Sequence, residues 1–185
     1  MAVPSFPITT NRLLLRPFTS ADIDAFLAIY AIPDVSRFLY TDPFDAATGM
    51  AVLQKRTAIP EFDGDDQTLT LAMVVRDTDD VIGNLTFFYR SHIHRHGEIG
   101  FVVRPDAQGQ GFAREGATGL LRLGFSHLGL HRITGRCDAR NTASAFVMTR
   151  LGMRKEAHFR ENEFVKGEWT DELVFAILAS EWTGG

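Results

Sequence analysis

A glycine-containing turn joins a short apolar stretch to a helical pattern near the middle of the chain. Residues 98–103 (Glu-Ile-Gly-Phe-Val-Val) read as a strand, and residues 108–115 (Gln-Gly-Gln-Gly-Phe-Ala-Arg-Glu) lead directly into a helix. The first backbone N–H groups of a helix have no intrahelical partner, and the helix dipole adds partial positive charge there. Gly109 and Gly111 lack the Cβ atoms that would block close approach of a ligand. The sequence therefore predicts an anion site at this turn, most commonly one for phosphate.

Two common phosphate motifs do not fit this turn. The dinucleotide fingerprint needs a small residue where Arg114 stands, and no Gly-Lys-Ser/Thr sequence occurs for a Walker loop. The remaining pattern is Gln108, Gly111 and Ala113. It resembles the pyrophosphate loop Gln/Arg-x-x-Gly-x-Gly/Ala of the GNAT superfamily of acyl-CoA-dependent N-acetyltransferases. The competing interpretation is an ordinary glycine-rich turn before a helix.

Three other segments resemble one branch of that superfamily, the RimJ/RimL-like ribosomal-protein N-terminal acetyltransferases. Asn141 to Ser144 opens a helix that ends in an Arg-Leu-Gly-Met sequence at residues 150–153, as in the branch's Asn-x-x-Ser…Leu-Gly-Phe/Met segment. Residues 9–17 resemble its first strand, and residues 169–171 with 173–182 resemble its closing strand. The resemblance implies a single GNAT acetyltransferase domain over residues 1–185, with a core at about 8–182.

Composition agrees with a protein of this kind. A chain of 185 residues with 45% hydrophobic and 23% charged residues is typical of one globular domain. The formal charge of −4 argues against a nucleic-acid binder, although local arginines could still meet one phosphorylated cofactor. The candidates flank the turn at residues 108–115 and the segment at residues 141–153: Arg104, Arg114, Arg140 and Arg150.

Several features predict a cytoplasmic protein that does not engage a membrane. The lone Cys137 rules out an internal disulfide and is best read as a small apolar residue on a buried strand, rather than a nucleophile. The longest apolar run, residues 173–179, is too short to cross a bilayer, and the N-terminus lacks a secretion signal. We expect a monomer or a homodimer, in which the terminal hairpin could pair between subunits.

The order of predicted elements gives the fold class. Thr19 and Asp22 match a capping box for the first helix, and Gly129 ends the third. The pattern predicts an α/β (mixed α+β) protein with a twisted, mostly antiparallel mixed sheet of about seven strands and helices on both faces. The GNAT resemblance adds splayed central parallel strands. Strands are expected at residues 8–16, 68–75, 81–89, 98–103, 131–138, 154–166 and 170–178, and helices at about 22–30, 45–56, 113–128 and 142–151.

The resemblance also implies acetyl-CoA as co-substrate, with no metal. In GNAT folds the strand before the phosphate turn offers free backbone groups to the pantetheine arm and polarises the thioester carbonyl. One such oxyanion donor is typically worth about 10²–10³ in rate. The expected cofactor-binding residues are Phe101, Val102, Val103, Gln108, Gly109, Gln110, Gly111, Phe112, Ala113, Arg114, Asn141 and Ser144.

Glu98 is the candidate general base. A lysine amine is neutral at pH 7 in only about one molecule in 2,500, whereas an α-amine is neutral in roughly one in seven, so a weak base suffices for an N-terminus. Glu98 could act directly or through a water. The competing interpretation is a solvated strand-end carboxylate or a structural hydrogen-bond acceptor, with water or a histidine at residues 92–96 as the base.

Ser144 is the second catalytic candidate. Many GNAT enzymes carry a tyrosine four residues before the glycine of Leu-Gly-Phe as general acid for the thiolate, but this chain has Met148 there. In the RimJ/RimL-like branch a serine one turn into the helix lies near the sulfur, and Ser144 matches it. Asn141 is expected to cap the helix and to approach the cofactor arm.

Two clusters suggest other roles. His92, His94 and His96 alternate and would share one face of an extended segment, which could indicate a metal site or substrate contacts, but a solvated loop is the preferred interpretation. The acidic segment at residues 61–66 could attract a cationic substrate but lacks the pattern of a calcium loop. We expect it to be a solvated turn.

The sequence thus predicts an enzyme that transfers acetyl from acetyl-CoA to a primary amine by direct attack in a ternary complex, with a protein N-terminal α-amine favoured. One alternative is acetylation of a small amine such as an antibiotic, polyamine or amino sugar. Another is a catalytically silent acyl-CoA-binding domain. The acceptor would be selected by the loops at residues 34–43, 61–67 and 90–97.

Overall fold

The computed structural model describes residues 5–184, which form one eight-stranded sheet in the order β1-β2-β3-β4-β5-β6-β8-β7. All neighbouring strands are antiparallel except β5 and β6, which are parallel. The strands are β1 (Ile8–Thr9), β2 (Leu13–Pro17), β3 (Gln67–Val75), β4 (Val81–Ser91), β5 (His96–Val103), β6 (Arg132–Asp138), β7 (Arg154–Val165) and β8 (Glu168–Leu178). The expected mixed, mostly antiparallel sheet is therefore present.

The count of strands differs from the expected seven because the first predicted strand is a hairpin. Thr10 turns the chain: its hydroxyl accepts a hydrogen bond from the Leu13 N–H at 3.0 Å, and its N–H donates to the Leu13 carbonyl at 2.9 Å. Short polar side chains that bond nearby backbone in this way favour turns over continued strand. β1 and β2 consequently pair with each other.

Residues 5–184 contain five α-helices: α1 (Ile23–Tyr30), α2 (Pro33–Ser36), α3 (Ala46–Arg56), α4 (Phe112–Arg122) and α5 (Thr142–Arg150). The capping box of Thr19 and Asp22 forms as predicted and leads through a short 3₁₀ turn into α1. A π-helical segment, Leu123–His127, extends α4 towards Gly129. The segment at residues 34–43 was expected to be a loop, but it begins with α2, where Pro33 takes the first helical position that its fixed φ suits.

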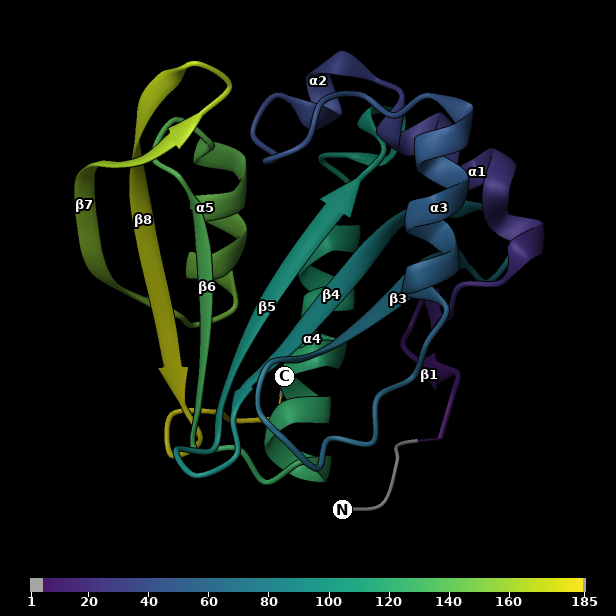
Figure 1. The fold of residues 1–185 in the computed structure, drawn as a ribbon. Helices are drawn as coiled ribbons and strands as arrows, with labels where there is room; N and C mark the ends of the chain where they lie inside the picture. The colour runs from purple at the N-terminus through teal and green to yellow at the C-terminus, as the bar shows by residue number, and fades with distance from the viewer. Residues whose placement is uncertain (1–4, 185) are drawn as a thin grey trace.

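The helices cover both faces of the sheet, as the pattern predicted (Figure 1). On one face Ala117, Leu120 and Leu121 of α4 and Met148 of α5 pack in the larger core cluster. On the other face α1 and α3 supply a second cluster that contains Phe26, Ile29 and Tyr30. Burial of these apolar side chains holds the layers together, and both layers leave the end of the sheet beside α2 free to form a site.

The parallel strands β5 and β6 separate after three residue pairs. They are paired at His96 with Arg132, Gly97 with Ile133 and Glu98 with Thr134, and no pairing follows. Figure 1 shows the two strands together at the bottom of the view and diverging towards the top. Beyond the fork β5 stays paired with β4, and β6 stays paired with β8. The splayed parallel strands that the resemblance implied are thus present, and each has one open edge.

Candidate active site

A cavity of about 470 Å³ lies at this fork. Its walls come from the end of β5, the turn into α4, the exposed side of α5 and residues 34–39, which we call the α2 segment. Eleven of the twelve predicted cofactor residues line it: Phe101, Val102, Val103, Gln108, Gly109, Gly111, Phe112, Ala113, Arg114, Asn141 and Ser144. Gln110 is the exception: it does not line this cavity, and its predicted contact with the cofactor stays a prediction for its backbone N–H.

The turn into α4 presents a row of backbone donors. Within residues 5–184, none of the N–H groups of residues 109–114 donates a hydrogen bond, whereas the next N–H, that of Glu115, donates to the Gly111 carbonyl. Gly109 and Gly111 have φ angles of 74° and 84°, in the left-handed region that glycine adopts without strain. Gly111 is the N-cap residue of α4. The geometry therefore matches the predicted anion cradle.

The two glutamines of the turn brace it with their side chains. Gln108 donates from Nε2 to the Val103 carbonyl at 2.9 Å, which ties the turn to the end of β5. Gln110 donates from Nε2 to the Asp106 carbonyl at 3.0 Å, and this directs its amide away from the cavity. A local hydrogen bond within the turn thus accounts for the direction of the Gln110 side chain, while the Gln110 backbone N–H stays unpaired among the described residues.

Sequence analysis missed a second brace, made by Arg12 and Glu115. The Glu115 carboxylate accepts hydrogen bonds from the Thr10 hydroxyl at 2.6 Å, the Arg12 N–H at 2.6 Å and Arg12 Nε at 2.7 Å. The Arg12 guanidinium also donates to the Gln110 carbonyl and lies 4.3 Å from the centre of the Phe112 ring. Burial alone would raise the pKa of Glu115, but the hydrogen bonds from Thr10 and Arg12 lower it. The N-terminal hairpin thereby anchors the first turn of α4.

This anchor predicts a pH-dependent stability difference. Glu115→Gln should lower the free energy of unfolding by about 2 kcal/mol at pH 7, because hydrogen bonds to a charged group are replaced by neutral ones. The folded-state pKa of Glu115 is lowered, so its contribution is complete above the unfolded carboxyl pKa of about 4.3 and is lost as the pH falls through the folded-state pKa. Urea unfolding at several pH values measures it.

The control for that experiment is Glu168→Gln, which removes an exposed partner of Arg140 and should change stability by less than about 1 kcal/mol. A difference between wild type and Glu115→Gln that stays the same from pH 7 to below the folded-state pKa of Glu115 would contradict the assignment.

The four candidate arginines divide into two pairs. Arg104 is held by Asp80 and Asp106, each at 2.7 Å, and Arg140 is held by Asp138 and Glu168. Arg114 and Arg150 line the cavity, and neither makes an ion pair within the described residues. Because carboxylates already compensate Arg104 and Arg140, the cationic character of the cavity comes from Arg114 and Arg150.

We therefore expect Arg114→Ala to weaken CoA binding about tenfold, or 1.4 kcal/mol, and to weaken binding of a CoA analogue lacking the 3′-phosphate or the pyrophosphate clearly less. Arg140→Ala is the matched control and should change neither affinity by more than about twofold, since Asp138 and Glu168 already occupy its guanidinium. Calorimetry with both ligands decides it. Equal losses for both ligands in Arg114→Ala would show that Arg114 does not contact phosphate.

The open edge of β5 provides the backbone groups expected for a thioester. Residues 99–103 have no partner on β6, and they continue to pair with β4 on the other side. Phe101, Val102 and Val103 line the cavity. An edge of this kind can pair with an extended ligand through main-chain hydrogen bonds. The strand is therefore suited to the role that the resemblance implied.

Glu98 lies at the fork itself. It belongs to the last pair that β5 makes with β6 and is the third residue of β5, so it is not a strand-end residue as expected. Its side chain is 13% exposed and forms ion pairs with Arg90 and Arg136, at 3.1 and 3.3 Å. It does not line the cavity, from which it is separated by about three residues of strand, or roughly 10 Å.

α5 supplies the other wall. The Asn141 side chain caps the helix by accepting a hydrogen bond from the Ser144 N–H at 3.0 Å, as predicted. Ser144 lines the cavity, and its hydroxyl has no hydrogen-bond partner within residues 5–184. Met148 is buried in the core, where its sulfur packs close to Gly135. A serine hydroxyl therefore faces the cavity on a helix whose Met148 points into the core.

The apolar wall opposite the phosphate turn was not predicted in detail. Val35, Phe38 and Leu39 of the α2 segment line the cavity together with Phe146 and Val147 of α5. On α5 a signal was available, because Ala143, Val147 and Arg150 recur at intervals of three and four residues and so share a helix face. The α2 side chains reach the cavity through tertiary packing, which the sequence pattern does not encode locally.

The histidine and acidic clusters have structural roles. Residues 92–95 form a turn, so His92, His94 and His96 do not share the face of an extended segment. His92 contacts the Tyr89 hydroxyl at 3.1 Å, and its N–H donates to Asp65 of the acidic segment at 2.6 Å. Among the described residues, no group of three or more His, Cys, Asp or Glu side chains is placed to hold a metal ion.

Comparison with known proteins gives a consistent result. Residues 12–154 match the family described as "Acetyltransferase (GNAT) domain". An uncharacterized N-acetyltransferase of Bacillus subtilis, YnaD, is 33% identical over 175 residues, covering 95% of this chain and 98% of the relative. The crystal structure of a GNAT-family acetyltransferase from Bacillus anthracis superposes with a TM-score of 0.85 at 29% identity, covering 94% of this chain and 99% of that one.

Two relatives with named acceptors are also similar. The [Ribosomal protein uS5]-alanine N-acetyltransferase of Escherichia coli is 25% identical over 196 residues, covering 99% of this chain and 96% of the relative. The spermidine N(1)-acetyltransferase of Vibrio cholerae is 30% identical over 110 residues, covering 59% of this chain and 64% of the relative. No helix in the described part of the chain is long and apolar enough to span a membrane.

Proposed function

Since the chain belongs to the GNAT family of acetyl-CoA-dependent N-acetyltransferases, we propose that it acetylates a protein N-terminal α-amine by direct attack in a ternary complex. The observation that carries this proposal is the strand fork, with an open edge of β5 leading to a row of unpaired N–H groups at α4. A thioester with a long phosphorylated arm fits both features at once.

The residues that would hold acetyl-CoA follow from the geometry. The N–H groups of residues 109–114 would bind the pyrophosphate, with Arg114 and Arg150 supplying positive charge. The open edge of residues 99–103 would pair with the pantetheine arm and donate to the thioester carbonyl as negative charge develops there. Ser144 would donate a proton or a hydrogen bond to the departing thiolate.

Direct transfer is favoured over a covalent acetyl-enzyme. The one cysteine, Cys137, lies on β6, and burial raises the pKa of its thiol to about 11. A thiol with that pKa is almost fully protonated at neutral pH, and the thiol form is a poor nucleophile. The amine of the acceptor would therefore attack the acetyl group itself, and Glu98 would accept the amine proton directly or through a water.

Two arguments favour an α-amine as the acceptor. An α-amine is neutral far more often at pH 7 than a lysine amine, and Glu98 is a weak base that lies about three residues of strand away from the cavity. Among relatives that match over nearly the whole chain, the one that acetylates a ribosomal-protein alanine is 25% identical, and the spermidine N(1)-acetyltransferase of Escherichia coli is 20% identical. Acetylation of a polyamine is the alternative that the second relative supports.

A panel of three acceptors tests the proposal. The panel consists of peptides with a free N-terminal alanine or serine, the same peptides with a blocked N-terminus and an internal lysine, and spermidine. We expect kcat/KM to be highest for the free N-terminus. A higher kcat/KM for spermidine would replace the proposed acceptor with a polyamine, and cofactor binding without turnover would favour a silent binding domain.

A cytoplasmic location belongs to the same proposal, since acetyl-CoA and nascent protein N-termini meet in that compartment. A monomeric or homodimeric state also stays a prediction. Size-exclusion chromatography with light scattering would measure it directly.

A further inference from the structure

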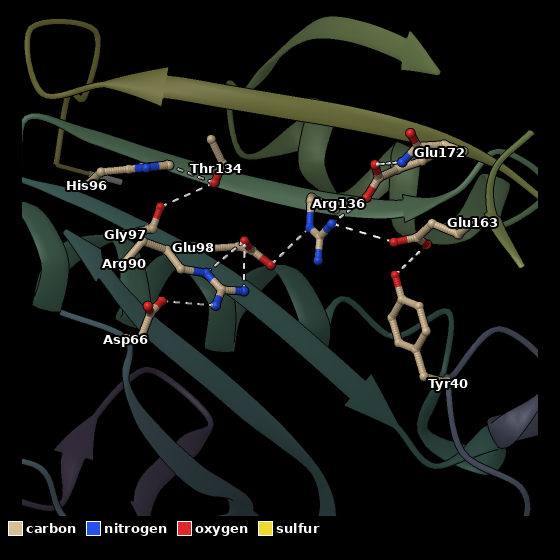
Figure 2. A network of polar contacts seen from close by, with 11 residues as sticks. Tyr40, Asp66, Arg90, His96, Gly97, Glu98, Thr134, Arg136, Glu163 and Glu172 are labelled. Atoms are coloured by element: carbon tan, nitrogen blue, oxygen red, sulfur yellow. Dashed lines mark hydrogen bonds and ion pairs between the residues drawn. The ribbon is translucent and has the colours of Figure 1, made fainter. Parts of the chain in front are cut away.

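Glu98 is the centre of a chain of polar contacts that runs across the fork (Figure 2). One carboxylate oxygen, Oε2, accepts from Arg90 Nε at 3.1 Å, and the other, Oε1, accepts from Arg136 Nε at 3.3 Å. Arg90 comes from β4 and Arg136 from β6, so one guanidinium reaches Glu98 from each side of β5. Both oxygens are therefore held, and the plane of the carboxylate is fixed.

The Arg136 contact is the weaker of the two because three carboxylates share this guanidinium. Its Nη1 atom lies 2.7 Å from Glu172 and 3.7 Å from Glu163, while its Nε reaches Glu98 at 3.3 Å. Glu172 is buried, with a side chain 6% exposed, and it accepts a further hydrogen bond from Asn162. A small movement of Arg136 towards Glu163 or Glu172 would consequently release Glu98.

Tyr40 connects this chain to the segment between α2 and α3. Its hydroxyl donates to Glu163 Oε2 at 2.5 Å. A second contact joins the turn between β7 and β8 to the end of α2, since Lys166 Nζ donates to the Ser36 carbonyl at 2.7 Å. The α2 segment also lines the cavity through Val35, Phe38 and Leu39. Tyr40 is therefore placed to transmit a displacement of this cavity wall to Glu163 and so to Arg136.

We propose that Arg136 is a positioning residue that fixes the orientation and charge of Glu98, and that Tyr40 controls the hydrogen bond between Arg136 and Glu98 through its own contact with Glu163. The inference rests on the proposed role of Glu98 as the base, but it concerns the state of that carboxylate and can be measured without turnover. Because the Tyr40 hydroxyl donates to Glu163, this carboxylate attracts Arg136 Nη1 less strongly. The Nε atom of Arg136 therefore keeps its hydrogen bond to Glu98. An acceptor bound against the cavity wall formed by Val35, Phe38 and Leu39 would thus change how Arg136 holds Glu98.

Other charged groups also face Glu98 and are held constant in the test. They come from every neighbouring strand and the adjacent turn: Arg90 from β4, His96 from β5, Glu172 from β8, Glu163 from β7, and Asp66, which lies 3.7 Å from Arg90. Among the described contacts, Glu163 is the one of these groups that connects Glu98 to Tyr40, through Arg136. The bridge through Arg136 and Glu163 is the distinctive feature.

The test is a pH titration of the Glu98 carboxyl by carbon NMR of protein with labelled glutamate, in which the Glu98 signal is identified by its loss in Glu98→Gln. Arg136→Met should raise the midpoint, because an opposite charge that favours the carboxylate is gone. Tyr40→Phe should raise it by a smaller amount. The double variant should match Arg136→Met alone, because Tyr40 acts through Arg136.

The matched control is Arg154→Met on β7, whose partner Glu181 lies outside the chain of contacts, and it should leave the midpoint unchanged. Arg136→Lys keeps the charge and should restore much of the midpoint but not the rate, since it cannot bridge as a planar group does. If Arg136→Met does not fold, Arg136→Gln, which removes the charge but keeps a polar side chain, and Tyr40→Phe carry the same measurement.

A wild-type midpoint in Arg136→Met, or additive shifts in the double variant, would overturn the inference. In parallel, kcat should fall about tenfold in Arg136→Met with acetyl-CoA affinity unchanged. If wild-type protein acetylates no amine while the midpoint still moves as expected, the proposed function fails and this inference is upheld.

Discussion

Glu98→Gln should lower kcat by about 10²–10³ while leaving acetyl-CoA affinity nearly intact. Loss of a general base typically costs about 10²–10⁴ in rate, and less where the amine is already partly neutral. The affinity should persist because the backbone of β5 is unchanged and Glu98 does not line the cavity. The defect should shrink as the pH rises, since the amine then loses its proton without help. Steady-state rates over a range of pH, with calorimetry of acetyl-CoA, measure both quantities.

Ser144→Ala provides the contrast for that experiment. If Ser144 assists thiolate departure, its penalty should shrink with a CoA analogue whose leaving thiol is more acidic, whereas the Glu98→Gln penalty should not respond to the thiol. A Glu98→Gln defect that is independent of pH and accompanied by a lower melting temperature would show that Glu98 is structural. Proton removal would then be assigned to water or to a histidine of residues 92–96.

Gly111→Asp should reduce acetyl-CoA affinity at least tenfold, or 1.4 kcal/mol, in a protein that still folds. The variant places a negative charge at the N-cap of α4, among the N–H groups that we propose bind the pyrophosphate. It also forces a non-glycine residue to a φ of 84°, a left-handed conformation with a cost of about 1–2 kcal/mol to stability. Calorimetry measures the affinity, and urea unfolding measures the stability.

Gly167→Asp is the matched control because Gly167 has a φ of 87° and open space around its missing Cβ atom, yet it lies in the β7–β8 turn. It should carry a similar stability cost with unchanged affinity. Gly111→Ala adds the Cβ atom and the strain without the charge, so Gly111→Asp should lose more affinity than Gly111→Ala does. Unchanged acetyl-CoA affinity in folded Gly111→Asp would remove the phosphate turn from the account.

The sequence predicted the order of elements because its signals were local. Gly129 ends the α4 pattern with a φ of 59°, Asp45 caps α3, and residues 76–80 form the expected turn between β3 and β4. The first strand was predicted as continuous although residues 9–12 read Thr-Thr-Asn-Arg, a polar stretch that could have indicated a turn, and the Thr10 hydrogen bonds form that turn. Local chemistry thus carried most of the fold.

The site was predicted where the motif is made of backbone and was incomplete where side chains decide. Whether an arginine is available to phosphate depends on its neighbours: Asp106 and Asp138 lie two residues from Arg104 and Arg140 and compensate both, a spacing that could have been noticed. Glu98, by contrast, meets Arg136 across 38 residues of sequence, through the pairing of β5 with β6. That contact follows from the register of the sheet, which the pattern of residues does not specify.

The position of the α2 segment likewise could not be predicted from the sequence. A four-residue helix leaves almost no periodic signal, and the apolar side chains of Val35 and Leu39 also pack against the core cluster beneath α1. In the structure they line the cavity, and Tyr40 reaches Glu163 of the β7–β8 hairpin. This side of the cavity is therefore built by contacts between segments more than a hundred residues apart.

Bisubstrate initial-velocity kinetics of CoA release test the central claim most directly. Acetyl-CoA and a peptide with a free N-terminal alanine would be varied together, and the products would be identified by mass spectrometry. Direct transfer in a ternary complex predicts intersecting reciprocal plots, an acetylated α-amine and no acetylated protein. Parallel plots with an acetylated enzyme, or no CoA release above background with any primary amine, would contradict it.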